Sequence, residues 1–162
     1  MNFTLRPIEA NDNPVIAKII RAVLTEFKVN KPGTVFSDPT TDRLYEVFLT
    51  EKSIYNIAEL NGEIVGGCGI FPTKGLPKDT CELVKMYLLP HARGKGIGKM
   101  LIEKSLEQAQ HLGYQKIYLE TMPELSQALK VYEQYGFTYL SAPMGQSGHT
   151  GCQLWMIKAI KA

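Results

Sequence analysis

A glycine-rich turn between a strand and a long amphipathic helix is the most constraining feature of this 162-residue chain. The segment from residue 87 to 100 reads YLLPHARGKGIGKM, with glycines at 94, 96 and 98. Glycines let a backbone approach a bulky group closely, and a helix N-terminus adds exposed N–H groups and partial positive charge. The segment therefore predicts an anion-binding site, and a phosphate group is the expected ligand.

Two common phosphate motifs do not fit this turn. A Walker A loop needs a glycine five residues before its Gly-Lys pair and Ser or Thr after it, but Arg93 and Met100 occupy those positions. A dinucleotide fingerprint needs a third glycine where Lys99 or Leu101 stands. A P-loop NTPase and an NAD site are therefore excluded. The alternative to a phosphate site is a plain glycine turn with a solvated basic rim.

Hydrophobic periodicity predicts strands and helices along the whole chain. The clearest local signal is Asn61-Gly62 between two β-branched runs, which favours a hairpin. Apolar residues at helical spacing predict a helix from Pro14 to Phe27, with Val15 on its buried face, and a second one near Leu44. The expected order is βααβββαβαββ, an α/β fold with a mixed sheet and helices on both faces, in a single domain over residues 1–162. The expected strands cover residues 2–7, 53–60, 63–71, 81–89, 116–121, 137–140 and 153–158, and the later helices residues 98–112 and 126–135.

Composition excludes several classes of protein. The chain carries a net charge of +2, so no global charge favours nucleic acid or an anionic membrane. No apolar run approaches the ~18 residues of a membrane span, and the N-terminus lacks the pattern of a signal peptide. The three cysteines suit neither a zinc site nor a disulfide framework, so we expect no metal, buried thiols at Cys68 and Cys81, and a soluble cytoplasmic protein.

Two motifs together resemble the GCN5-related N-acetyltransferase (GNAT) superfamily. The first is Arg93-x-x-Gly96-x-Gly98 after a strand and before a long helix, and the second is ALKVYEQYGF over residues 128–137. The resemblance extends over nearly the whole chain and includes the element order. It implies acetyl-CoA as cosubstrate, with its pantetheine arm bound by the main chain of Tyr87 and Leu88, next to Leu89. It also implies that the pyrophosphate is held by the amides of Arg93, Gly94, Lys95, Gly96, Ile97, Gly98 and Lys99.

The resemblance implies two catalytic side chains. Tyr132 occupies the family's tyrosine position, and a phenol with a pKa near ~10 can protonate a departing thiolate, so we expect a general acid there. Glu82 lies eleven residues before Arg93, where the histone-acetylating branch carries its general base. The alternatives are that Tyr132 is a core aromatic residue, and that Glu82 anchors the substrate ammonium or pairs with Lys85.

Three features of the expected site stay open. Leu125 stands where many family members carry an asparagine that contacts the coenzyme. The oxyanion donor could come from the backbone of the splayed strands or from Glu120 and Thr121. The acceptor pocket is expected between residues 27–45 and 144–152, and we expect His149 to be a solvent-exposed loop residue, with substrate contact as the alternative.

The sequence thus predicts an N-acetyltransferase that transfers the acetyl group of acetyl-CoA directly to a primary amine in a ternary complex. A small-molecule amine is the expected acceptor, with a protein or peptide amine as the alternative. A non-catalytic acyl-CoA-binding or sensing module is the second hypothesis. Nucleic-acid binding through the basic segment 85–104 is disfavoured because no aromatic residues interleave it. The resemblance also implies that a homodimer is possible, formed through an exposed final strand.

Overall fold

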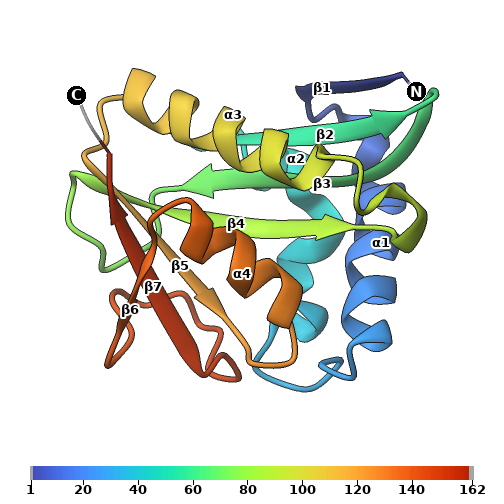
Figure 1. Cartoon of the computed structure of the whole chain (residues 1–162). Coiled ribbons are helices and arrows are strands. Elements are labelled where there is room, and N and C mark those ends of the chain that lie inside the picture. The colour runs from blue at the N-terminus through green and yellow to red at the C-terminus, as the bar shows by residue number, and fades with distance from the viewer. Residues whose placement is uncertain (1, 161–162) are drawn as a thin grey trace.

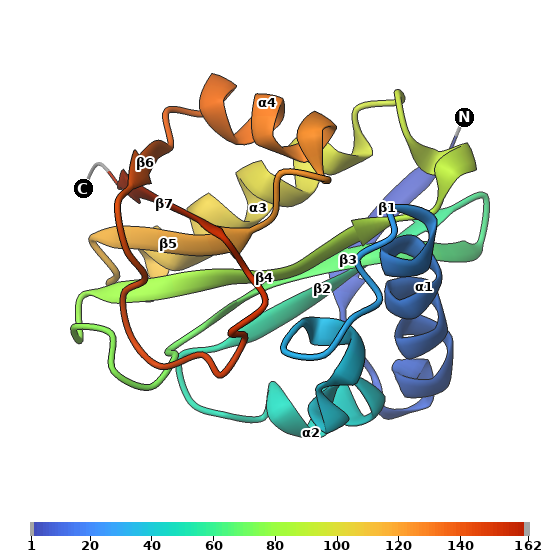
Figure 2. The same cartoon turned by 90° about the horizontal axis from the view of Figure 1, so that it is seen from below.

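The computed structural model describes residues 2–160, which form one seven-stranded mixed sheet with helices on both faces (Figures 1 and 2). The strand order in the sheet is β1-β2-β3-β4-β5-β7-β6. The element order is the expected one, so the predicted α/β fold is confirmed. Within these residues no helix is both long enough and apolar enough to cross a membrane. The strands are β1 (Phe3–Pro7), β2 (Ile54–Leu60), β3 (Glu63–Phe71), β4 (Thr80–Leu88), β5 (Lys116–Thr121), β6 (Thr138–Leu140) and β7 (Leu154–Ala159), and the α-helices are α1 (Asn13–Glu26), α2 (Leu44–Val47), α3 (Ile97–His111) and α4 (Ser126–Gln134).

Each face of the sheet carries its own hydrophobic core. The core with α1 and α2 contains Ile16, Ile20 and Leu24, whose fourfold spacing places them on one side of α1. The core with α3 and α4 contains Leu101 and Ile102 from α3. Figure 2 shows α1 and α2 on one side of the strands, and α3 and α4 on the other. The predicted buried stripe of α1 was wrong only at its start, because Val15 is 43% exposed there.

The sheet splits in its middle. The parallel strands β4 and β5 pair only from Thr80–Lys116 to Glu82–Tyr118, after which β5 continues its pairing with β7 alone. Figure 1 shows the two strands diverging beyond this point. Shortly after the split, Lys85 takes a positive φ of 53°, and the β3–β4 register is irregular opposite it. The second half of β4 therefore has one edge without a neighbouring strand, and a cleft opens there.

The final strand does not lie at an edge of the sheet, which corrects our expectation. β7 pairs with β5 on one side and with β6 on the other. The edges are β1 and the three-residue β6. A chain-terminal strand can be interior because β6 is connected to β7 by a long loop that lets β7 insert next to β5. A homodimer stays a prediction, without an exposed final strand to support it.

Two of the three cysteines are buried in the core and unreactive. Cys68 and Cys81 are both fully buried, as expected. Burial raises the pKa of each of these thiols to about 12, so both stay protonated near neutral pH. Among residues 2–160 no cluster of three or more His, Cys, Asp or Glu side chains is arranged to hold a metal ion.

Candidate active site

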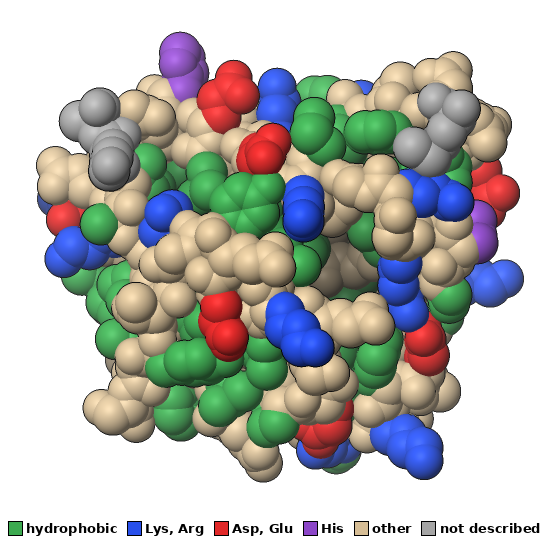
Figure 3. Space-filling view, viewed as in Figure 1, with side chains coloured by type: hydrophobic (Ala, Val, Ile, Leu, Met, Phe, Trp, Pro, Cys, Tyr) green, Lys and Arg blue, Asp and Glu red, His purple; other side chains and the backbone are tan. Residues whose placement is uncertain are grey.

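The split between β4 and β5 opens into a cavity of about 400 Å³. Figure 3 shows the surface hollowed between the start of α3 and α4, with Lys and Arg side chains around the opening. The cavity brings together eight of the twelve predicted site residues, namely Tyr87, Leu88, Arg93, Gly94, Gly96, Gly98, Lys99 and Tyr132. The remaining four, Glu82, Leu89, Lys95 and Ile97, do not line it.

The glycine loop presents free backbone donors to one end of this cavity. Gly94 and Gly96 have φ values of +73° and +85°, and a Cβ added to either would meet no atom within 4 Å. Within residues 2–160, none of the N–H groups of residues 94–99 donates a hydrogen bond. The α3 N-terminus begins at Ile97 without a side-chain cap, and the buried Ile97 side chain anchors it. Six unpaired amides at a helix N-terminus fit a pyrophosphate, so the residues present are suited to a nucleotide-containing coenzyme.

Arg93 holds the end of β4 in place. Its guanidinium donates to the Leu88 carbonyl oxygen at 2.9 and 3.1 Å and pairs with the Glu26 carboxylate of α1 at 2.7 and 2.8 Å. It also lies 5.1 Å from the ring centroid of Phe27. The neighbouring Leu89 N–H donates to the Val65 carbonyl oxygen, so it is not free for a ligand. The Arg93 side chain thus orients the loop, while its charge is already paired.

Tyr132 lies at the opposite wall, on α4. Its side chain is almost fully buried, packs edge-on against Phe137, and directs its hydroxyl toward the Met86 sulfur at 4.0 Å. Burial raises the pKa of the phenol far above its ordinary value, so the hydroxyl remains protonated at neutral pH. Tyr132 therefore belongs to the core and also lines the cavity, and its role as general acid stays a prediction.

Glu82 lies just behind the cavity, where β4 and β5 separate. It is 3% exposed, and its Oε1 accepts a hydrogen bond of 2.6 Å from the Thr73 hydroxyl. Burial is the main reason that its pKa rises to about 7, with a further rise from the Glu120 charge, while Thr73 and Lys85 oppose the shift. Glu82 forms no ion pair with Lys85 among the described residues. A carboxylate with this pKa is half ionised at neutral pH, which suits proton transfer.

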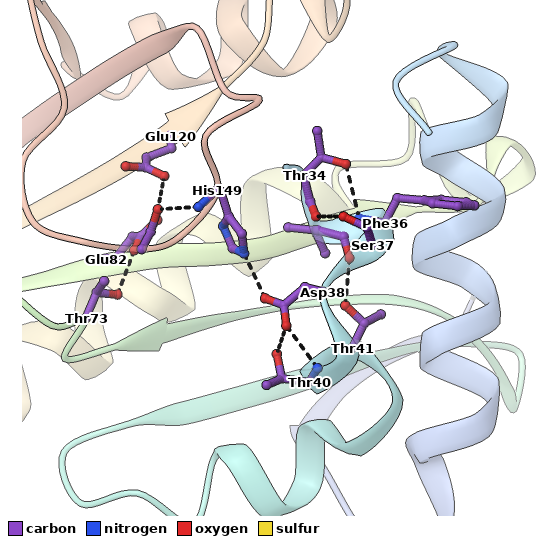
Figure 4. Close-up of polar contacts among 12 residues, drawn as sticks. Thr34, Phe36, Ser37, Asp38, Thr40, Thr41, Thr73, Glu82, Glu120 and His149 are labelled. Atoms are coloured by element: carbon purple, nitrogen blue, oxygen red, sulfur yellow. Dashed lines mark hydrogen bonds and ion pairs between the residues drawn. The ribbon is translucent and has the colours of Figure 1, made fainter. Parts of the chain in front are cut away.

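Two loops distant in sequence meet over this end of the cleft. His149 Nε2 lies 2.9 Å from the Asp38 carboxylate (Figure 4), and the Gly151 N–H donates to the Gly33 carbonyl oxygen. On the other side, the Ser147 hydroxyl donates to Glu120. The expectation of a solvent-exposed His149 was wrong, because its side chain is only 12% exposed. Its partner Asp38 lies 111 residues earlier, so the sequence carried no signal for the pair.

The His149–Asp38 contact predicts how the loop 144–152 is held. Burial alone would raise the pKa of Asp38, but hydrogen bonds from His149 and Thr40 outweigh it and lower the pKa to about 2. We expect His149→Ala to increase amide hydrogen exchange in residues 144–152 about 10-fold, since a hydrogen bond to a charged group contributes roughly 1.5 kcal/mol or more. His91→Ala, at an exposed histidine outside the cleft, is the control. Equal exchange in both variants would show that the pair does not hold the loop.

Leu125, which stands where many family members carry an asparagine, is an apolar part of the cavity wall. It is the residue before α4 and supplies no side-chain cap to that helix. Leu125 and Gln127 both line the cavity. Of the two polar residues that follow Leu125, Ser126 and Gln127, only Gln127 lines the cavity.

The cavity lining also includes Lys85, Glu120 and Thr121, whose roles the sequence left open. Glu120 and Thr121 end β5 at the split, and Lys85 stands at the irregular position of β4. Glu120 accepts hydrogen bonds from the Tyr118 and Ser147 hydroxyls. A strand irregularity has no sequence pattern of its own, so the position of Lys85 could not be predicted.

The split mixed sheet is the fold of several solved acetyltransferases. A GNAT acetyltransferase from Staphylococcus aureus Mu50 superposes with a TM-score of 0.83 over 99% of this chain and 100% of that one, at 19% identity. The putative acetyltransferase yncA from Salmonella typhimurium, solved with its cofactor acetyl-CoA, gives a TM-score of 0.75 over 100% and 96% of the two chains, at 22% identity. These likenesses confirm the predicted fold.

Sequence comparison assigns the family. Residues 20–137 match the pattern of the Acetyltransferase (GNAT) family. The chain is 40% identical over 157 residues to the uncharacterized N-acetyltransferase YjgM of Escherichia coli K12, covering 96% of this chain and 94% of that one. The chain therefore belongs to the GNAT family and is an N-acetyltransferase.

Proposed function

We propose that this enzyme transfers the acetyl group of acetyl-CoA to a primary amine of a small molecule, directly and within a ternary complex. The observation that carries the proposal is one continuous cleft with free phosphate-type donors at one end and a proton acceptor and a proton donor near the other. A protein or peptide amine is the less favoured acceptor, because the loop 144–152 binds the cavity residue Glu120 through Ser147 and is itself joined to the loop 33–39.

The chain's own residues would bind the coenzyme in an extended form. Acetyl-CoA supplies an activated thioester, which makes acyl transfer to an amine favourable. The unpaired amides of residues 94–99 bind the pyrophosphate, and the open edge of β4 at Tyr87 and Leu88 binds the pantetheine arm. This arrangement places the reacting end between Tyr132 and the split at Glu82.

The two predicted catalytic residues meet the proton requirements of the reaction. Glu82, directly or through one water, accepts the proton of the acceptor ammonium, since only a neutral amine is nucleophilic. Tyr132, which stays protonated, donates a proton to the departing thiolate. Backbone donors on the unpaired part of β4 stabilise the developing oxyanion. The roles given to Glu82 and Tyr132 are proton transfers, and neither forms a covalent bond to the acetyl group. We therefore propose direct transfer.

The proposal is tested by calorimetric titration of the protein with acetyl-CoA and with free CoA, followed by release of CoA thiol across a panel of amines. We expect saturable one-to-one binding and amine-dependent thiol release. Binding without thiol release from any amine would favour an acyl-CoA-sensing module. An absence of binding would overturn the proposal.

Glu82→Gln is expected to change the pH dependence of the reaction. In the wild type, kcat/KM should rise with pH through about 7, because the base must be ionised and its pKa lies there. In the variant, kcat/KM should fall roughly 100-fold or more and this inflection should disappear, since a positioned general base contributes typically 10²–10⁴-fold. Initial rates between pH 5.5 and 9 measure both effects, with the exposed Glu107→Gln as control.

Glu82→Gln is also expected to change how the stability of the protein depends on pH. The folded pKa of Glu82, about 7, lies above the ordinary 4.5, so the folded protein binds the extra proton between these values. Its contribution to stability is complete below pH 4.5 and is lost as the pH rises to about 7. In urea unfolding, the free energy of unfolding of Glu82→Gln minus that of wild type should therefore increase as the pH is raised from 5 to 8. A constant difference across that range would contradict the raised pKa.

A further inference from the structure

Lys85 places a cationic side chain on the wall of the active-site cavity without a partner. Its side chain is half-buried and lines the same cavity as Glu120 and Tyr132. Among residues 2–160, its ammonium makes no hydrogen bond and no ion pair. Desolvation lowers its pKa from the ordinary value, and the charges of Asp38 and Glu82 oppose that shift. The described residues leave no fully buried side-chain nitrogen without a partner, so this ammonium is reachable from the cavity, where an anionic ligand could pair with it.

The backbone at Lys85 is held in place, which fixes the point from which its side chain extends. The residue has a φ of +53°, an uncommon conformation for a lysine, and the Tyr55 hydroxyl donates to its carbonyl oxygen at 2.8 Å. Tyr55 is fully buried, so the position is held from within the core. A residue kept in a rare conformation by buried contacts is a candidate for a specific role.

The coenzyme phosphates are not the expected partner of Lys85. It lies three residues before Leu88 on β4, or roughly 10 Å at the rise of a strand, and the glycine loop is farther still. Its position is instead beside the split of the sheet, close to the charges of Glu82 and Asp38. Lys85 therefore belongs to the end of the cavity where the acetyl group meets its acceptor.

The two acids whose charges act on Lys85 are not among the cavity-lining residues. Asp38 contacts His149 and accepts from the Thr40 N–H and hydroxyl, and Glu82, which accepts from the Thr73 hydroxyl, is 3% exposed. Glu120 accepts from two hydroxyls, but an ionised carboxylate has about four acceptor positions, so it can still bind an ammonium. The cavity lining thus includes a cation without a partner among residues 2–160, on β4, and a carboxylate with spare acceptor capacity, on β5.

We propose that Lys85 binds the carboxylate of an amino-acid-like acceptor, whose amino group lies toward Glu120 and Glu82. This inference rests on the proposed function and names the acceptor class. A polyamine would bring a second cation against Lys85, and a simple alkylamine would leave Lys85 unpaired. An acceptor that carries both an amine and a carboxylate satisfies both sides of the site.

The test compares acceptors that differ only in the carboxylate. Each of the twenty common amino acids is assayed beside its primary amide and its decarboxylated amine, with wild type, Lys85→Met and Lys85→Arg. We expect wild type to prefer one or a few amino acids over their amides. Lys85→Met should raise KM for those amino acids about 10- to 150-fold, the range for hydrogen bonds to charged groups, and leave the amides unchanged. Lys85→Arg should restore part of the loss, because it keeps the charge.

Further measurements separate this role from a structural or catalytic one. Acetyl-CoA affinity by calorimetry should be the same in wild type and Lys85→Met, which shows that the cavity is intact. Lys18→Met removes an exposed charge of α1 and should change no KM. A fall in kcat of Lys85→Met that is equal for amino acids and amides would assign Lys85 to oxyanion stabilisation and overturn the proposal.

Three further outcomes would overturn the proposal. Acetylation of decarboxylated amines as efficient as that of amino acids would overturn the carboxylate role while the proposed function stands. Acetyl-CoA binding with no amino acid acetylated would likewise overturn it. Failure of wild type to bind acetyl-CoA would remove the proposed function and this inference together.

Discussion

Gly96→Val is expected to weaken acetyl-CoA binding at least 100-fold. Gly96 has a φ of +85°, where a β-branched residue costs roughly 1–3 kcal/mol. A Cβ at this position meets no protein atom within 4 Å, so it would occupy the open space in front of the loop amides. Steric crowding of the coenzyme and backbone strain at position 96 thus act together. Calorimetric titration with acetyl-CoA measures the effect.

Gly62→Val is the matched control for this variant. Gly62 has a φ of +83° in the β2–β3 hairpin turn, and an added Cβ there also meets nothing within 4 Å. Both variants should lose a similar amount of stability in urea unfolding, and only Gly96→Val should lose the coenzyme. Unchanged affinity in Gly96→Val would show that the loop does not bind the pyrophosphate. Equal loss in both variants would assign the effect to stability.

Tyr132→Phe is expected to lower kcat about 100-fold or more while acetyl-CoA affinity stays within a few-fold of wild type. A positioned general acid contributes typically 10²–10⁴-fold, and removing the hydroxyl deletes that proton source. The hydroxyl makes only a weak contact with the Met86 sulfur at 4.0 Å, so the ring keeps its packing against Phe137. Steady-state kinetics with an accepted amine, together with calorimetry, separates the two quantities.

Tyr139→Phe provides the comparison for Tyr132→Phe. Tyr139 is 49% exposed on β6, and its hydroxyl donates to Glu133, outside the cleft. Its loss should leave kcat unchanged. If Tyr132→Phe also retained full kcat, Tyr132 would be a core aromatic residue, as the alternative interpretation of the sequence holds. A loss of coenzyme affinity without a change in kcat would instead give it a binding role.

Local sequence patterns predicted most of the fold because each depends on neighbouring residues. Asn61-Gly62 has positive φ values at both positions, as a tight hairpin turn requires, and β3 begins at Glu63 as expected. Gly113 ends α3 with a φ of +91°. The buried stripe of α1 follows its spacing except at Val15, which lies in the first turn beyond the edge of the sheet-facing side.

The glycine loop and its place before α3 could likewise be predicted, because strand, loop and helix are contiguous. The roles of the carboxylate at 82 and the phenol at 132 were predicted only through the family resemblance, not from a local physical pattern. Their burial and the raised pKa of Glu82 required the structure, since desolvation depends on every segment packed around a group.

The sequence by itself determined the element order, the family and the phosphate-type loop, since all three are written in contiguous motifs and periodicities. Only the tertiary structure decided that β7 inserts beside β5, that β4 and β5 separate after Glu82, and that His149 meets Asp38 across the cleft. It also decided that Lys85 lines the cavity with no hydrogen-bond or ion-pair partner among residues 2–160. These features depend on strand pairing and loop contacts between residues far apart in the chain, which no local pattern encodes.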